Sequence, residues 1–306
     1  MAGHIMQNQV VNFAVDYIIR NLTAELKVDD VAQACGYSPY YLERLFKAET
    51  GESIYSFVKR FKVEQSAFRL KVEKERPVSA IGEEYGYSSS NYATLFKRHF
   101  GRTPAVFREQ ICQELQENSF FHEPETGLWS YEICSRNITV VQNREYFVLY
   151  ERRKGNYHNL VGNWRDFLQK YEKFIGQDTV FLEITYDDPS IVADDKCLYD
   201  ICMTVNREDP RLTCQKTAAV GITSRVQTEP FPNTMTIPGG KYAVYRYKGY
   251  PKLIYKAYQS VFCNWLSGTE YQIDHRIGYD IYHRIDEDSL YMELDICIPI
   301  KEKGYF

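Results

Sequence analysis

The pattern of apolar and polar positions changes once along the chain, near residue 113. Before that point apolar residues recur at intervals of three and four, which is typical of amphipathic helices. After residue 126 the chain becomes rich in strand patterns and in tyrosine. The pattern predicts a multi-domain protein with an all-α part over 7–112, a linker over 113–127 and an α+β part over 128–303.

The helical part contains one sixteen-residue stretch twice. "GYSPYYLERLFKAETG" (36–51) and "GYSSSNYATLFKRHFG" (86–101) agree at seven of sixteen positions. In each copy a glycine ends one helix, because it adopts the left-handed backbone readily, and Ser38 or Ser88 is placed to cap the next. A helix, a glycine turn and a capped second helix make a helix-turn-helix, so the pattern predicts two such units.

A long helix is predicted between the two units, over residues 53–74. Its apolar positions fall largely on one side, and they are Ile54, Phe57, Val58, Phe61, Ala67 and Phe68. At 1.5 Å per residue it is a spacer of about 30 Å. Successive major grooves lie about 34 Å apart, so one chain could read two of them.

The second helix of each unit carries rings, hydroxyls and long basic side chains away from its core positions. These groups contact base edges and phosphates in DNA-binding helices. The expected DNA-contacting residues are Ser38, Tyr40, Tyr41, Glu43, Arg44 and Lys47, then Ser89, Ser90, Asn91, Thr94, Lys97 and Arg98. The alternative is that both are ordinary amphipathic helices whose charged faces meet only solvent.

The double unit with its connecting helix resembles the DNA-binding domain of the AraC/XylS family of bacterial transcription regulators, over roughly residues 7–110. Its place at the front of the chain is similar to the MarA, SoxS and Rob branch, and the order of domains, with the DNA reader first and the sensor last, most resembles Rob. The resemblance implies promoter DNA as a partner, with RNA polymerase also expected. By position it implies base contacts in one groove from Tyr40, Tyr41, Glu43 and Arg44, and in the next from Asn91 and Thr94.

The back half also repeats. Residues 146–171 parallel 241–266, each as a strand, a Lys-Gly turn and an amphipathic helix, and "LYDICMTV" (198–205) parallels "ELDICIPI" (293–300). Each copy reads as a strand, a helix and more strands, and two copies can share one sheet about a pseudo-two-fold axis. The seam between the copies is a natural place for a ligand.

The last strand pattern places two carboxylates on one face. Tyr291, Glu293 and Asp295 alternate with aliphatic residues that belong against helices. If their face lines a cavity, the carboxylates favour a cation; the alternative is a face washed by solvent. Roughly residues 128–303 resemble the GyrI-like effector-binding domain, which implies an acidic residue on this strand in an aromatic pocket for bulky, often cationic molecules. Asp295 is the matching residue, and the expected walls are Trp164, Tyr247, Tyr279 and Tyr282.

Composition narrows the function classes. The eight cysteines are scattered without a CxxC pair and lie largely in apolar stretches, which predicts reduced core thiols and a cytoplasmic location. Residues 1–110 carry 15 Lys/Arg against 13 Asp/Glu, whereas the whole chain carries 37 against 41, so the front is the more basic part.

The sequence holds no P-loop, no HExxH and no Gly-x-Ser-x-Gly, and its six histidines are dispersed. We expect no metal, no cofactor, no membrane association and no catalysis. The leading interpretation is a one-component transcription regulator, expected to be an activator, that senses a small hydrophobic or cationic effector. The alternatives are a GyrI-like hydrolase, or a drug-sequestering domain fused to a DNA-binding module.

Overall fold

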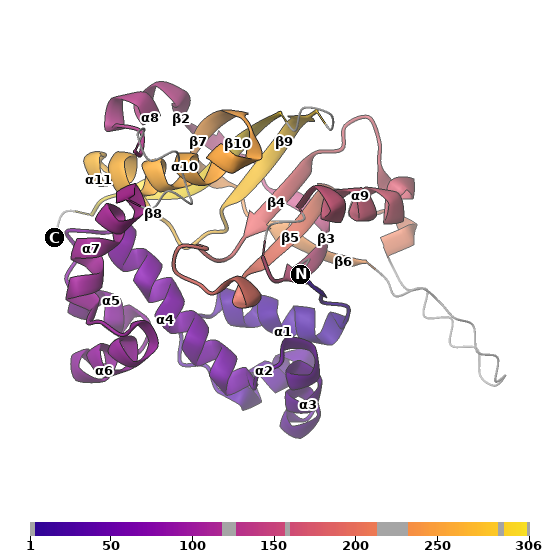
Figure 1. Cartoon of the computed structure of the whole chain (residues 1–306). Coiled ribbons are helices and arrows are strands. Elements are labelled where there is room, and N and C mark those ends of the chain that lie inside the picture. The colour runs from indigo at the N-terminus through magenta and orange to yellow at the C-terminus, as the bar shows by residue number, and fades with distance from the viewer. Residues whose placement is uncertain (1–3, 118–126, 157–159, 213–231, 287–290, 305–306) are drawn as a thin grey trace.

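The computed structural model describes residues 4–117, 127–156, 160–212, 232–286 and 291–304. A bundle of helices forms the front part of the chain, and an antiparallel sheet with attached helices forms the back part (Figure 1). The predicted fold class is therefore confirmed. The last front helix continues through Glu117, inside the expected linker, and the rest of that linker up to residue 126 lies outside the described residues.

The front helices have the predicted order. They are α1 (Gln9–Arg20), α2 (Val28–Cys35), α3 (Pro39–Thr50), α4 (Ile54–Val72), α5 (Val78–Glu84), α6 (Ser89–Phe100) and α7 (Pro104–Glu117). Gly36 ends α2 with φ 73°, and Gly86 follows α5 with φ 82°, as the glycine turns require. The Ser38 hydroxyl accepts the Tyr41 N–H at 3.4 Å, as predicted. Ser88 also precedes its helix, but its side chain makes no capping hydrogen bond.

The back part is built on one sheet with the strand order β1-β3-β5-β4-β9-β10-β7-β2, in which β6 also pairs with β3 and β8 with β10. The strands are β1 (His4–Ile5), β2 (Ile138–Asn143), β3 (Tyr146–Lys154), β4 (Phe181–Thr185), β5 (Leu198–Thr204), β6 (Asn233–Ile237), β7 (Gly240–Gly249), β8 (Tyr271–Ile273), β9 (Tyr279–Ile285) and β10 (Met292–Glu302). The helices are α8 (Tyr131–Asn137), α9 (Leu160–Lys170), α10 (Ile254–Ser260) and α11 (Leu266–Gly268), with the π-helical η5 (Val261–Trp265) between the last two.

The sheet has the predicted internal duplication. The group β3-β5-β4 with α9 corresponds to β7-β10-β9 with α10, and the two groups meet where β4 pairs with β9. Even one ion pair is repeated, because Arg152 lies opposite Asp200 on β3 and β5 as Arg246 lies opposite Asp295 on β7 and β10. The pseudo-two-fold axis therefore passes through the centre of the sheet, between β4 and β9.

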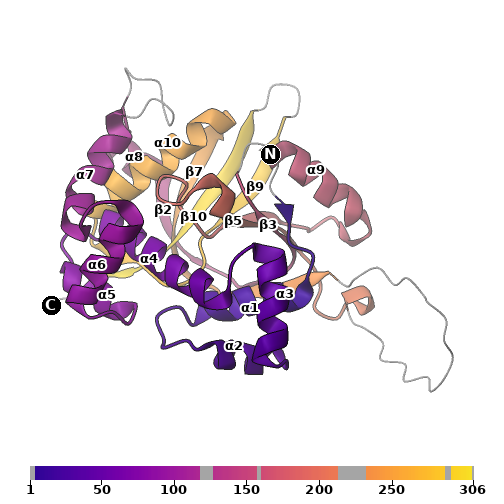
Figure 2. The same cartoon turned by 60° about the horizontal axis from the view of Figure 1, so that its bottom comes forward.

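The helices of the back part leave the centre of one sheet face uncovered. Trp164 and Phe167 of α9 pack on Leu149, Tyr199 and Ile201 from β3 and β5. A separate cluster joins α10 and η5 to β7 and β10. Figure 2 shows α9 and α10 apart from one another across the sheet. Residues of β4 and β9, between the two copies, line a cavity.

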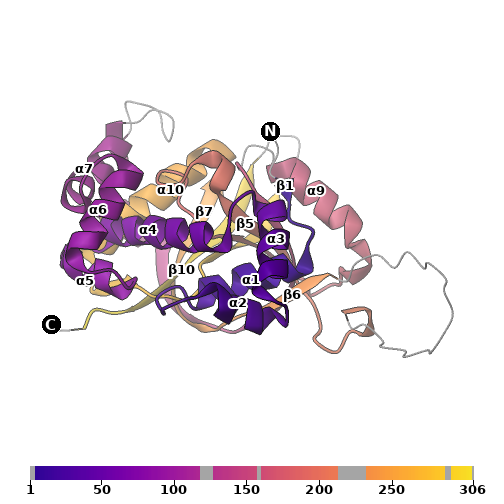
Figure 3. The ribbon, with the colours of Figure 1, turned by 90° about the horizontal axis from the view of Figure 1, so that it is seen from below.

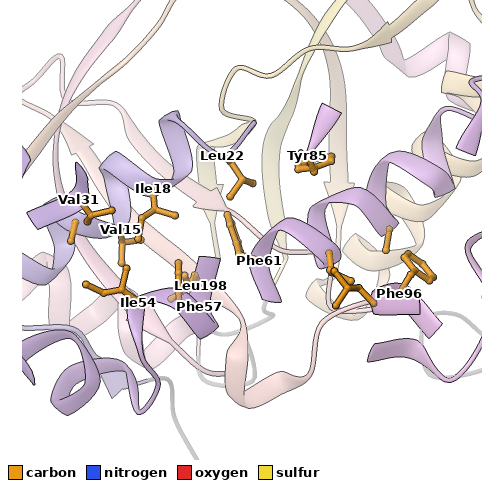
Figure 4. Close-up of a cluster of buried hydrophobic side chains, with 14 of the residues drawn as sticks. Val15, Ile18, Leu22, Val31, Ile54, Phe57, Phe61, Tyr85, Phe96 and Leu198 are labelled. Atoms are coloured by element: carbon orange, nitrogen blue, oxygen red, sulfur yellow. The ribbon is translucent and has the colours of Figure 1, made fainter. Parts of the chain in front are cut away.

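Helix α4 is buried on more sides than its apolar pattern predicts. Ile54, Phe57 and Phe61 face the helical core as expected, but Lys71 is also completely buried and Glu64 is 3% exposed. The core cluster in Figure 4 joins these apolar residues to Leu198 of β5. Seen from below in Figure 3, α4 runs between the α1–α3 group and the α5–α6 group. The spacer between the two units thus also contacts the sheet, as do β1, which pairs with β3, and α1.

None of the helices in the described ranges is long and apolar enough to cross a membrane.

Candidate functional site

The first helix-turn-helix exposes an aromatic and basic cluster at the start of α3. Tyr40 is 81% exposed, and the rings of Tyr37 and Tyr41 stack with centroids 5.2 Å apart. The Arg44 guanidinium lies 5.7 Å from the Tyr41 ring, within the range of a cation–π contact. This cluster offers a planar surface and a positive charge together, which is what contact with bases and phosphates requires.

Glu43 differs from the other residues predicted on this face. Its carboxylate accepts the backbone N–H of Ile54 at 3.2 Å, at the N-terminus of α4, where the helix dipole favours a negative charge. The carboxylate therefore joins α3 to the spacer helix, and a base contact would have to compete with that bond. Lys47, one turn further along α3, is exposed.

The second helix-turn-helix exposes the predicted face of α6. Tyr92 and Phe96 are buried, and Thr94 donates a hydrogen bond to the Ser90 carbonyl at 3.0 Å. The predicted contact residues on α6 are all exposed, namely Ser89, Ser90, Asn91, Thr94, Lys97 and Arg98. Their contacts with DNA stay predictions, as do those of α3.

A cavity of about 530 Å³ lies over the centre of the sheet. Its floor comes from β4 and β9, and its walls come from Leu160 and Val161 of α9 and from Tyr255 and Tyr258 of α10. Phe68 of α4 closes part of it, so the front part of the chain contributes to the wall. Cavities of this size, largely apolar with a few polar groups, are typical of small-molecule sites.

Two carboxylates face each other on the floor of this cavity. Glu183 of β4 and Asp280 of β9 are directly paired across the strands, and each is 3% exposed. The Tyr282 hydroxyl and the Trp164 indole N–H donate to Glu183 at 3.1 and 3.3 Å, and the Tyr258 hydroxyl donates to Asp280 at 2.5 Å. Neither carboxylate has a cationic partner among the described side chains.

Burial changes the acidity of this pair. It raises the pKa of Glu183 to about 7, against the opposing effect of hydrogen bonds from Tyr282 and Trp164. Burial also raises the pKa of Asp280 well above its usual value, and the nearby Glu183 adds to the shift. Ionisation of these two carboxyl groups is unfavourable because no cation of the described residues pairs with them. A cation that enters the cavity would supply that pairing and favour the ionised form.

The carboxylates that sequence reasoning proposed do not line this cavity. Leu294 and Ile296 of β10 do face the helices, as expected, and Glu293 and Asp295 therefore point to the opposite face. There Glu293 pairs with Lys248 at 2.9 Å, and Asp295 pairs with Arg246 at 3.0 Å. The cavity lies on the helix-covered face, so alternation places both residues outside it, and their contact with an effector stays a prediction.

Of the aromatic residues that the sequence suggested as walls, some lie at this cavity and others lie elsewhere. Tyr282 lines the cavity and the Trp164 indole reaches Glu183, so these two belong to the site. Tyr247 packs below α10 and donates its hydroxyl to the Tyr250 carbonyl, and the Tyr291 ring lies against the Tyr250 ring. Tyr279 packs in the core of the opposite face.

Sequence reasoning missed Glu183 and Asp280 although a signal was present. "FLEITYDD" and "GYDIYHR" each carry a carboxylate in an apolar strand, and the duplication makes the two strands equivalent. The internal repeat that we recognised in the sequence, 198–205 with 293–300, instead drew attention to the neighbouring strands β5 and β10. Those strands carry Asp200 and Asp295, and both lie on the far face beside arginines.

The cavity adjoins the contact between α4 and the sheet. The ring of Phe68 meets that of Phe262 edge-on at 5.0 Å, and both residues line the cavity. The buried Lys71 ammonium donates to Asp188 at 2.6 Å and also to Gln259, and these two residues line the cavity as well. A molecule in the cavity therefore lies against side chains that hold the spacer helix in place.

Comparisons with known proteins agree with both parts of the structure. The model of a helix-turn-helix domain family matches residues 31–110, and that of the GyrI-like small molecule binding domain matches residues 136–301. The regulatory protein SoxS of Salmonella typhimurium is 29% identical over 104 residues, covering 34% of this chain and 96% of SoxS. The multiple antibiotic resistance protein MarA of Escherichia coli is 33% identical over 113 residues, covering 37% of this chain and 87% of MarA. The solved EcmrR C-terminal domain is 13% identical with a TM-score of 0.41, covering 54% of this chain and 98% of that domain.

A double helix-turn-helix joined to a small-molecule-binding sheet domain defines a DNA-binding transcription regulator with an effector domain. The chain belongs to the AraC-type regulator family of MarA and SoxS through its front part and to the GyrI-like family through its back part.

Proposed function

We propose that this regulator is an activator whose effector is an apolar cation, bound over Glu183 and Asp280 and sensed through α4. The functional division is the one expected from the sequence, with a DNA reader over 7–112 and a sensor over 128–303. The observation that carries the proposal is the cavity, because one of its walls belongs to the DNA-binding part.

The chemistry of the cavity supports a cationic effector. Two buried carboxylates, neither of which has a cationic partner among the described side chains, face a space lined by Tyr255, Tyr258 and Phe262. The aromatic rings favour an apolar body and add cation–π attraction, while the carboxylates favour a positive charge. A neutral molecule of the same shape would use the rings only.

The position of α4 supports a link between effector and DNA. The helix connects the two reading units, and its side chains Phe68 and Lys71 contact residues of the cavity wall. An effector that displaces Phe262 or Gln259 changes the support of α4, and with it the relative placement of α3 and α6. The effector can shift DNA affinity only by its differential affinity for the two arrangements.

On the DNA side we propose the exposed faces of α3 and α6 as the reading surfaces. The main proposed DNA contacts are Arg44 and Tyr40 on α3 and Asn91 and Lys97 on α6, all of which are exposed. RNA polymerase is the proposed further partner, since an activator works by contact with it. The proposal includes no catalytic step.

The test is to measure promoter affinity by fluorescence anisotropy with and without tetraphenylphosphonium, in the full chain and in Phe68→Ala. We expect the cation to change the affinity of the wild type and to lose most of this effect in the variant. Phe13→Ala is the matched control, since this phenylalanine of α1 is 50% exposed and is not among the residues that line the cavity. A wild type that binds the cation with no change in promoter affinity would contradict the coupling.

One observation favours a second candidate, a hydrolase. A buried glutamate with a pKa of about 7 is suited to act as a general base near neutral pH. Turnover of reactive small molecules by the full chain, lost in Glu183→Gln, would support it. Binding without turnover, across compounds that occupy the cavity, would speak for the sensor alone.

A further inference from the structure

A further carboxylate, that of Asp187, lies in the cavity wall beside the ion-paired Asp188. Asp187 follows β4 by two residues and is 6% exposed. Its Oδ2 accepts the backbone N–H of Leu198 at 2.7 Å, but its Oδ1 is buried without any hydrogen-bond partner among the described residues. A buried carboxylate oxygen left unpartnered costs free energy, and such an atom in a cavity wall marks the place where a ligand donor fits.

The neighbouring cations are already engaged elsewhere. Lys71 is held by Asp188, and Arg60 pairs with Glu52 and Glu64 at 2.6 Å each. Burial and the charge of Glu64 raise the pKa of Asp187 to about 7, and Arg60 offsets only part of this. Glu64 and Arg60 of α4 therefore act on Asp187 with opposite signs, and the pKa of Asp187 stays raised.

The distance between Asp187 and the Glu183–Asp280 pair has an upper bound that follows from the chain between them. Glu183, Thr185 and Asp187 all line the cavity, and four residues of extended chain span at most about 14 Å between the first and the last. Thr185 lies between the two acidic positions along the chain, and Tyr258, Phe262 and Phe68 contribute rings to the same lining. The cavity lining thus holds a second acidic position, Asp187, apart from the Glu183–Asp280 pair, together with several aromatic rings.

We propose that Asp187 is a second anchoring carboxylate and that the site selects elongated effectors with a cationic, hydrogen-donating group at each end. One end lies over Glu183 and Asp280, and the other donates to Asp187 Oδ1 beside α4. This inference rests on the proposed function, since it concerns the same effector site. It predicts that the second cationic group adds a contact beside the spacer helix to those that the apolar body makes.

The experiment compares 1,10-diaminodecane with decylamine by isothermal titration calorimetry on the full chain. The two probes share an alkyl chain and differ in the second ammonium group. We expect the wild type to prefer the diamine by at least about tenfold, the ratio that one charge-assisted hydrogen bond provides. In Asp187→Asn this preference should disappear, while decylamine binds as before.

The variant keeps an oxygen that can accept from Leu198, so its fold should persist, and unchanged tetraphenylphosphonium binding serves as the check. Asp178→Asn is the matched control, because Asp178 is an exposed aspartate outside the cavity lining. Glu183→Gln should weaken both amines alike. A second measurement needs no variant, since 1,4-diaminobutane is too short to reach both ends and should show no advantage over butylamine.

Equal affinities for diamine and monoamine in the wild type would overturn the inference, and so would a preference that survives in Asp187→Asn. If both amines fail to bind while tetraphenylphosphonium binds, the second anchor is wrong and the proposed function stands. If the wild type binds none of the three cations, the proposed function fails as well.

Discussion

The acidity of Glu183 predicts that cation binding depends steeply on pH. The carboxyl group is 3% exposed, and burial raises its pKa from the usual 4.5 to about 7. The carboxylate must be ionised to attract tetraphenylphosphonium, so affinity should rise with pH up to about 7 and level off above it. Glu183→Gln keeps the shape of the side chain and removes the titration.

The magnitude follows from the size of the shift. Moving a pKa from 4.5 to about 7 corresponds to about 3 kcal/mol of differential free energy between the two protonation states. Below about pH 7 each further drop of one pH unit should lower the affinity for tetraphenylphosphonium by up to about tenfold. Asp280 ionises less readily once Glu183 is charged, because the two carboxylates are cross-strand partners.

The same shift affects the stability of the unliganded protein with a definite sign. The folded state holds the Glu183 proton more tightly than the unfolded state, so this group destabilises the fold as pH rises from about 4.5 to about 7. Urea unfolding of the wild type should show a loss of up to about 3 kcal/mol from Glu183 over this range. Glu183→Gln should show a shallower dependence.

The assay is calorimetric titration with tetraphenylphosphonium from about pH 5 to about pH 8, repeated in buffers of different ionisation enthalpy to count released protons. Near pH 6, binding to the wild type should release about one proton, and binding to Glu183→Gln should release fewer. An affinity that is constant over this range in the wild type, with no proton release, would refute the reasoning. It would mean that the cation binds without contact to the buried pair.

Three further outcomes are expected. Lys71→Met should lower the free energy of urea unfolding by about 3–5 kcal/mol because it leaves Asp188 buried and unpaired, and adding Asp188→Asn should recover part of that loss. Arg44→Ala should weaken specific promoter binding by about 1–3 kcal/mol in a gel-shift titration, and unchanged discrimination against random DNA would contradict its role. Gly82→Ala places a Cβ 2.7 Å from the Tyr92 ring in the second unit, so thermal unfolding should report a loss of about 1–3 kcal/mol, which an unaltered midpoint would disprove.

The sequence predicted the local structure of this protein well. Glycine turns, serine caps and three-and-four spacing are local signals, and they placed α2, α3, α5 and α6 correctly. Duplicated strand-helix patterns predicted a shared sheet with a seam, which is where the cavity lies. Two of the expected aromatic residues lie at that seam, since Tyr282 lines the cavity and the Trp164 indole N–H donates to Glu183.

The choice of carboxylates could not be made from the pattern. Alternation says that Glu293 and Asp295 share a face, but it does not say which face the helices cover over the centre of the sheet. Glu183 and Asp280 lie 97 positions apart in the chain, and only the pairing of β4 with β9 brings them together.

What the sequence by itself determined is the set of elements, their duplication and the two families, because these depend on spacing within short segments. What only the tertiary structure decided is how the two parts meet. The charged position Lys71 of α4 suits a solvated face equally well, yet it is buried because its partner Asp188 comes from a distant segment. Burial and charge pairing are properties of the assembled fold, and they decide which carboxylates can hold an effector.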